Sequence, residues 1–305
     1  MPLLSEYTTE VQNLIHDDSF SSVTSTQMTT FINAARQRVA KDAQCVRLLI
    51  SGQGPILSIA VNLGGHNYSN NPVVTVTGQM GTGCVSTATV VGGVITAIAV
   101  NNGGSNYSPP LLVTITDPTG MGATATASQA SNLLQTVVGQ EVYTYASANP
   151  LLQVTPGYNK ILDVITVAAT WGGMKPTLGQ VPWGSIEAYY RSYAVPTLGQ
   201  AYIWAKYGQG VFGSIYLWQI PSTAQAMDWD CICLPTDLVD DTSVDAVPDP
   251  FSDAVAYYAA HRCYLNAQRY ADSKTMKEFY TDFLLSARAT TGGTLVSDWY
   301  NQDAW

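Results

Sequence analysis

The sequence contains an internal repeat, in which residues 56–88 recur at 95–127 without a gap. ILSIAVNLGGHNYSNNPVVTVT aligns with ITAIAVNNGGSNYSPPLLVTIT, and 17 of the 33 aligned positions are identical. Self-similarity at a fixed offset indicates one structural unit that is used twice. Both copies are rich in β-forming residues and are interrupted by glycines, a composition that the rest of the chain lacks. We therefore predict that residues 52–130 form an inserted all-β domain of two tandem repeats.

Each copy carries a Gly-Gly-x-Asn-Tyr-Ser turn between its first two strands. Glycine adopts positive φ at little steric cost, and asparagine favours tight turns. Tyr68 and Tyr107 are expected to lie over the small core of each copy. The Asn-Tyr-Ser sequons at 67–69 and 106–108 are interpreted as coincidental, because the N-terminus MPLLSEYTTE has no basic segment and no apolar segment that would predict a secretory signal.

The composition of the chain limits the kinds of partner that it can have. Charged residues make up only 11% of the sequence, against roughly 25% in an ordinary soluble domain. Free monomers rely on charge for solubility, so this composition predicts that much of the surface lies against other chains. The net charge of −9, without a basic cluster, argues against tight nucleic-acid binding. No apolar run reaches the roughly 18 residues that a membrane helix needs, so no membrane partner is expected.

The five cysteines form an odd, scattered set. Cys231 and Cys233 have the wrong spacing for a CxxC redox or zinc motif, and on a strand they would share one buried face. We interpret them as structural thiols in a reducing compartment, the cytoplasm in which the protein is made.

Both ends of the chain are predicted to be helical. Apolar residues at helical spacing mark residues 4–16 and 26–49, with Ser25 or Thr26 as an N-cap candidate. Near the C-terminus, Asp249 is a predicted N-cap with Pro250 at the first helical position, and a second helix is expected at about 273–288. The tail that follows opens with a Gly-Gly break and ends in aromatic residues.

The segment between the helices is predicted to be β. The predicted strands are LLQTVVGQEVYTY, KILDVITVAATW, SIEAYYRSYA, AYIWAKYG, VFGSIYLWQI and MDWDCICLP. The predicted fold class is α+β, in which N- and C-terminal helices form a bundle with a β-sheet lobe, plus the inserted all-β domain. Residues 1–51 and 131–305 would then form one discontinuous body with a C-terminal extension at 291–305.

No pattern supports catalysis, a cofactor or a metal. Gly208-x-Gly210-x-x-Gly213 lies between two predicted strands, whereas a dinucleotide loop must open a helix, so it is interpreted as a hairpin loop. The three histidines carry no known signature around them. The acidic residues do not match a Ca²⁺ loop and are interpreted as favoured by the helix dipole and by solvation; they are Asp237, Asp240, Asp241, Asp245, Asp249 and Asp253.

Tryptophan and tyrosine are abundant between residues 171 and 229. They could form a carbohydrate platform, but aromatic side chains in strands are more often core and subunit interface, which we favour.

With 52–130 set aside, the chain resembles the head-to-tail connector (adaptor) proteins of tailed bacteriophages, over about 1–51 and 131–290. The resemblance lies in the order of several segments: FINAARQRVAKDAQCVR, QTVVGQEVYTY, KILDVITVA, WAKYGQGVFGSIYLWQIP, CICLPTDLVDD and the helical segment from PDPFSDAVAYYAAHRCYLNAQRY to LLSAR. The GGxNYS-type repeat is similar to β modules embedded in many phage virion proteins, and the simplest adaptors lack it.

The resemblance implies a non-enzymatic virion protein that forms a ring of about twelve copies between the portal and a tail tube or nozzle, with DNA passing through the middle. The inserted domain is expected on the outside, contacting tail fibres, capsid or solvent. Trp299, Tyr300 and Trp305 are predicted to be portal- or neighbour-facing anchors. The alternatives are a host-surface protein that reads glycans through Tyr68 and Tyr107, and, less favoured, a tail hydrolase that uses the carboxylates of 237–253.

Overall fold

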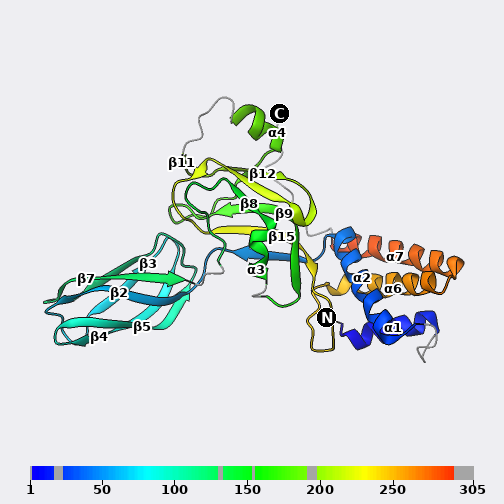
Figure 1. The fold of residues 1–305 in the computed structure, drawn as a ribbon, viewed down its shortest axis with the longest axis horizontal. Coiled ribbons are helices and arrows are strands. Elements are labelled where there is room, and N and C mark those ends of the chain that lie inside the picture. The colour runs from blue at the N-terminus through cyan, green and yellow to red at the C-terminus, as the bar shows by residue number, and fades with distance from the viewer. Residues whose placement is uncertain (1, 17–22, 130–132, 153–154, 191–197, 292–305) are drawn as a thin grey trace. The chain divides into compact units, whose positions relative to one another are not determined.

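The structure is a computed structural model that describes residues 2–16, 23–129, 133–152, 155–190 and 198–291 (Figure 1). The chain divides into two compact units. The first, which we call the helical unit, comprises residues 1–47, 155–160 and 232–305. The second, the β unit, comprises residues 48–154 and 161–231, and it includes both copies of the repeat. The boundary falls within strands β1, β9 and β15.

The helical unit is organised around one central helix. Its elements are α1 (Leu4–Ile15), α2 (Ser25–Ala43), the 3₁₀ turn η3 (Asp249–Phe251), α6 (Ser252–Asn266) and α7 (Tyr270–Thr291). Helix α6 lies between α1 and α7, and α2 also packs on it (Figure 1). The alanines of α6 at 254, 256, 259 and 260 are fully or almost fully buried. Such small side chains let neighbouring helices approach closely from several directions.

The N-cap of the second helix lies just before the predicted candidates, Ser25 and Thr26, and the helix ends earlier than predicted. Thr24 is its N-cap, and Thr24 and Gln27 form a reciprocal capping box. Gln44 adopts the left-handed conformation, and its amide donates to the carbonyl of Ala40, which ends the helix. Residues 47–49, predicted to be the last residues of this helix, instead lie in strand β1 (Arg47–Ser51). Leucine and isoleucine are compatible with both a helix and a strand, and here pairing with β15 selects the strand.

The remaining strands form several small sheets. They are β2 (Ile56–His66), β3 (Val73–Thr77), β4 (Thr82–Val91), β5 (Val94–Ser105), β6 (Leu112–Thr116), β7 (Met121–Gln129), β8 (Val142–Thr144), β9 (Tyr158–Ala169), β10 (Gly179–Gln180), β11 (Leu198–Gly199), β12 (Ile203–Tyr207), β13 (Ser214–Trp218), β14 (Ile220–Pro221) and β15 (Met227–Pro235). The sheet orders are β1-β15-β9, β10-β12-β13-β8, β11-β14, β4-β5-β2-β7 and β3-β6.

Two predicted strands are wrong. Only Val142–Thr144 of the segment 133–145 is a strand, and the chain continues into α3 (Tyr145–Leu152). The segment SIEAYYRSYA begins as the short helix α4 (Trp183–Ser185) and the π-helical turn η1 (Ile186–Tyr190). Ile186 is fully buried in a cluster with Ile203 and Trp218, so tertiary packing overrides the β propensity of this aromatic segment.

The two copies of the repeat are interlocked. Every ladder among β2–β7 joins a strand of the first copy to a strand of the second, as in β2–β5, β2–β7, β4–β5 and β3–β6. The registered pair Ile59 and Ile98 occupies equivalent positions of the two copies, so a pseudo-two-fold axis passes between them. One hydrophobic core contains residues of both copies. A single copy therefore has no partner strands of its own, and the prediction of one small core per copy is corrected.

The glycines of the shared motif make this interlock possible. A Cβ on Gly64 would collide with the carbonyl of Ile95, and a Cβ on Gly103 with that of Ile56. The second glycine of each pair, Gly65 or Gly104, has positive φ. Only glycine allows the backbones of the two copies to approach this closely.

The predicted fold class is corrected. The structure is mixed α+β, but its described strands contain more residues than its helices and are divided among five small sheets rather than one lobe. The terminal helices do not form a distinct bundle, since most of their packing passes through α6 and they share their unit with strand ends and a long loop. Assignment of 1–51 with 131–305 as one body and 52–130 as an insertion stays a prediction.

Candidate functional site

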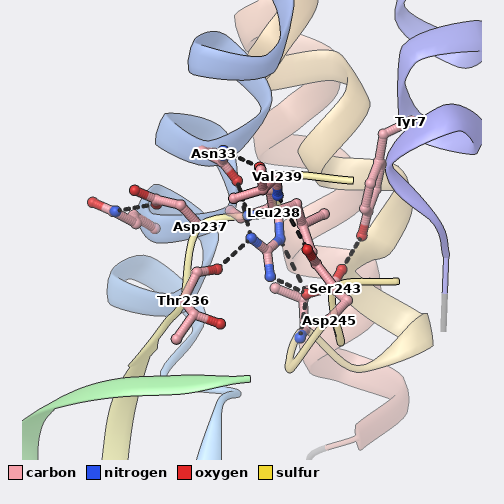
Figure 2. Close-up of polar contacts among 11 residues, drawn as sticks. Tyr7, Asn33, Thr236, Asp237, Leu238, Val239, Ser243 and Asp245 are labelled. Carbon is pink, nitrogen blue, oxygen red and sulfur yellow. Dashed lines mark hydrogen bonds and ion pairs between the residues drawn. The ribbon is translucent and has the colours of Figure 1, made fainter. Parts of the chain in front are cut away.

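A loop of the helical unit, residues 236–247, is fixed to the helices by a buried ion pair. We call it the acidic loop. The Arg36 guanidinium donates to Asp245 Oδ1 from Nε at 3.0 Å and from Nη2 at 2.5 Å, and both side chains are fully buried (Figure 2). The amide of Val247 also donates to Asp245 Oδ1, at 2.9 Å. A buried ion pair persists only when further hydrogen bonds satisfy its remaining polar atoms, and here they do.

Asn33 holds the other end of the same loop. Its amide group donates to the carbonyl of Leu238 at 2.9 Å and accepts from the amide of Leu238 at 2.8 Å, which imitates a strand pairing (Figure 2). Arg36 Nη1 donates to Asn33 Oδ1 at 3.1 Å and to the carbonyl of Thr236 at 2.7 Å. One turn of α2 therefore anchors both ends of the acidic loop.

Helix α1 closes this site from the other side. The hydroxyl of Tyr7 donates to Asp245 Oδ2 at 2.8 Å (Figure 2). Burial raises the pKa of Tyr7 far above its ordinary value, and the charge of Asp245 adds to the rise. The phenol therefore remains a proton donor throughout the physiological range. The amide of Ser5, in the first turn of α1, donates to Asp241 at 2.8 Å, so the acidic loop also caps this helix.

The tip of the acidic loop is ordered and exposed. Asp240 Oδ1 accepts hydrogen bonds from the amides of Thr242 and Ser243 and from both hydroxyls. These bonds, first that from the Thr242 hydroxyl, lower the pKa of Asp240. Val239 is 79% exposed and Val244 is also exposed. A groove beside the tip is lined by Thr26, Thr30 and Gln37 of α2 and by 237–239 of the loop.

This arrangement suits contact with another protein. Exposed valines on a braced loop can be buried by a partner at little entropic cost, because the loop is already ordered. In the part of the chain that the structure describes, no group of three or more histidine, cysteine or acidic side chains could hold a metal ion. No helix there is both long and apolar enough to cross a membrane.

A family model for the SU10 adaptor protein matches residues 95–301, about two thirds of the chain. The chain belongs to the SU10 adaptor protein family. The resemblance to phage adaptors is thus confirmed for 131–290, whereas residues 1–51 lie outside the match. The match begins at Ile95, the first residue of the second repeat copy. No curated protein matches this adaptor.

Family membership identifies the chain as a structural adaptor protein of a bacteriophage. It favours the adaptor interpretation over a host-surface or hydrolytic protein. It also places both the acidic loop and the helices α6 and α7 inside the matched segment, whereas Tyr7, Asn33 and Arg36 precede it.

Of the predicted interaction residues, Trp299, Tyr300 and Trp305 lie outside the described residues. Tyr68 and Tyr107 are buried, at 7% and 2% exposure. The ring of Tyr68 packs on the second copy and the ring of Tyr107 packs on the first, so both belong to the shared core of the repeats. No observation on these two rings favours the glycan-binding alternative, and their role in binding stays a prediction.

Interpretation of the acidic residues is correct for some and wrong for one. Asp253 lies in the first turn of α6 and Asp240 braces its own turn, which are the roles expected for exposed carboxylates. The predicted N-cap at Asp249 is corrected to Pro248, although Asp249 lies in the first turn of η3, where an acidic residue is favoured as expected. Asp245 neither caps a helix nor is exposed to solvent, because its side chain is fully buried against Arg36. Arg36 occupies the apolar stripe of α2 with Ile32 and Val39, and a charged residue on such a stripe was the signal that a buried partner exists.

Glu10 gives this adaptor a testable pH dependence. Burial raises the pKa of Glu10, and the nearby Asp253 carboxylate raises it further. A raised carboxyl pKa means that ionisation disfavours the folded state, so Glu10→Gln should raise the thermal unfolding midpoint at neutral pH. The gain should shrink as the pH falls through the folded pKa and vanish below the unfolded value. Melting curves across this range test it, with exposed Glu6→Gln as a comparison, and a gain independent of pH would contradict it.

Proposed function

We propose that this adaptor forms a ring that joins the portal to the tail at the head–tail junction of the virion, and that the ring assembles in the host bacterial cytoplasm. The family match over residues 95–301 is the observation that carries the proposal. Closed rings of identical subunits use heterologous interfaces, in which two different surfaces of each copy meet. Such a subunit needs apolar contact surfaces on more than one part of its fold.

The distribution of charge and apolar surface supports burial between copies. Residues 52–130 contain a single charged side chain, Asp117. Large apolar side chains are exposed in both units, including Val239 in the acidic loop, Met174 and, at 89% exposure, Phe212. Phe212 ends the short turn η2 (Gly210–Phe212) of a loop whose Gly208 and Gly210 have positive φ, consistent with the predicted hairpin. Exposed apolar groups on ordered turns are typical of protein interfaces.

DNA is proposed to pass through the ring without specific binding. The chain carries a net charge of −9, and repetition of that charge around a ring would repel phosphates. This keeps the duplex mobile during its exit. A specific DNA contact would instead need clustered lysine or arginine.

The partners in this proposal are further copies of the chain in a ring of about twelve, the portal on one face of the ring, and a tail tube or nozzle on the other. Trp299, Tyr300 and Trp305 would anchor the tail segment on the portal or on a neighbouring copy. The repeats at 52–130 would contact a tail fibre or the capsid from the outside of the ring.

Native mass spectrometry of the chain, alone and mixed with its portal, tests this proposal. We expect a complex with about twelve copies of the adaptor on each portal ring. Deletion of residues 291–305 should weaken that complex, whereas replacement of Thr294 and Ser297 by alanine, which keeps the aromatic residues, should not. Failure to bind the portal at any concentration would overturn the proposal. Normal assembly of the deletion variant would remove only the anchoring role of the tail.

A further inference from the structure

An exposed aromatic patch lies on the hairpin formed by α6 and α7. It consists of Tyr257 on α6 and of Phe279 and Phe283 on α7. The rings of Tyr257 and Phe283 are stacked, with centroids 4.8 Å apart and an interplanar angle of 14°, and the ring of Phe279 lies 5.7 Å from that of Tyr257. Phe279 and Phe283 remain 43% and 37% exposed. The patch is therefore preformed and open on its outer side.

The patch is separate from the face that α7 buries. Tyr280, Leu284 and Ala287 make up the buried face of this helix. Phe279 and Phe283 are one turn apart and lie at the margin of that face, beside α6. Their rings contact α6 on one side and leave their outer surface exposed, and contiguous exposed aromatic surface of this kind is typical of a binding site.

An uncharged path leads from the patch to the end of the helix. Ser286 and Thr290 follow Phe283 at helical spacing, so they lie on the same stripe, and the stripe ends beside Thr291, the last residue of α7. Phe283 lies eight residues before this end, or about 12 Å along the helix axis. The fourteen residues 292–305 could extend over about 46 Å. The length of the tail is thus ample for a return along α7.

The composition of the tail matches the patch. Residues 292–293 are both glycine, which permits a reversal of chain direction, and the tail then carries Leu295, Trp299, Tyr300 and Trp305. Aromatic rings pack favourably against other aromatic rings, by about 0.5–1.5 kcal/mol for each pair beyond the burial of area. Tethering also gives the tail an effective concentration in the millimolar range on its own patch.

We propose that, in the isolated chain, residues 292–305 fold back along α7 and pack their aromatic side chains on the patch of Tyr257, Phe279 and Phe283 of the same chain. The patch is then a docking site for the tail before any partner is present. This inference concerns the unassembled protein, so it stands or falls independently of ring formation and of portal binding.

Hydrogen exchange of the full-length chain, followed by mass spectrometry, tests the proposal. Amides of residues 294–305 should exchange at least about tenfold more slowly than in an unstructured peptide of the same sequence. The double variant Phe279→Ser and Phe283→Ser should remove this protection. Tyr270→Ser and Leu285→Ser alter two other exposed apolar residues of α7 and should leave it unchanged. Equal protection with and without the patch, or tail exchange at the unstructured rate, would overturn the proposal.

A reciprocal variant covers the case in which the patch substitutions unfold the helices. Trp299→Ser with Trp305→Ser leaves the patch intact, and it should remove protection in the tail and accelerate exchange in the segment 276–291. Unchanged exchange in both segments would again overturn the proposal. The measurement is repeated over a hundredfold range of protein concentration. Protection that grows with concentration would mean that the tail of a second copy occupies the patch, which also contradicts docking within one chain.

Discussion

Replacement of Asp245 with alanine is expected to destabilise the helical unit by about 3–5 kcal/mol, because it leaves the Arg36 guanidinium buried without its counter-charge. The hydroxyl of Tyr7 and the amide of Val247 lose the same acceptor. The acidic loop should detach from α1 and α2 as a consequence. Denaturant unfolding followed by the helical circular-dichroism signal measures the loss.

The matched control removes both charges. The double variant Arg36→Met with Asp245→Leu buries no unpaired charge, so it should recover much of the stability that Asp245→Ala loses. Asp240→Ala, in the exposed tip, removes only a local turn and should change the free energy of unfolding far less. A loss for Asp245→Ala no larger than for Asp240→Ala would show that the buried pair does not hold the loop.

Replacement of Tyr107 with alanine is expected to destabilise the interlocked repeats by about 3–5 kcal/mol, the usual cost of removing a buried aromatic side chain. Its ring packs on Gly81, and its hydroxyl accepts from the amide of Cys84 at 3.2 Å, both in the other copy. Because every ladder of the module joins the two copies, strands of both should lose protection in hydrogen exchange.

Tyr107→Phe keeps the ring and loses the hydroxyl, so its cost should be only about 0.5–1.5 kcal/mol. Tyr68→Ala is the pseudo-symmetric comparison, since the Tyr68 ring packs on Gly120 and its hydroxyl accepts from Ala123 at 3.1 Å. It should produce a loss similar to that of Tyr107→Ala. Protection lost in only one copy would contradict a shared core.

The four long helices near the two ends of the chain and most strands could be predicted from local patterns, whereas α3, α4 and η1 could not. The apolar stripes of α2, α6 and α7 repeat at helical spacing, although the N-cap of α2 is Thr24 rather than the predicted Ser25 or Thr26. Such signals depend on residues within a few positions of each other. They failed at β1 and at Ile186, where pairing or packing with distant residues decides the local state.

The acidic loop shows the same limit for the candidate site. Asp245 lies among six acidic residues that look alike in the sequence, and only one of them reaches Arg36, more than two hundred positions away. Nothing local distinguishes Asp245 from Asp240, although the first is buried and the second braces an exposed turn. Whether a charged side chain is buried depends on which helices and loops pack against it in the folded chain.

By itself, the sequence determined that the chain holds a β repeat used twice, helices at both ends, little charge and a relationship to phage adaptors. These properties are carried by composition and by spacing along the chain. Only the tertiary structure decided that the copies exchange strands around one core, that the terminal helices gather on α6 rather than in a bundle with one β lobe, and that Arg36 meets Asp245. Contacts between distant residues carry no periodic signal, because they form only when the packed elements bring those residues together.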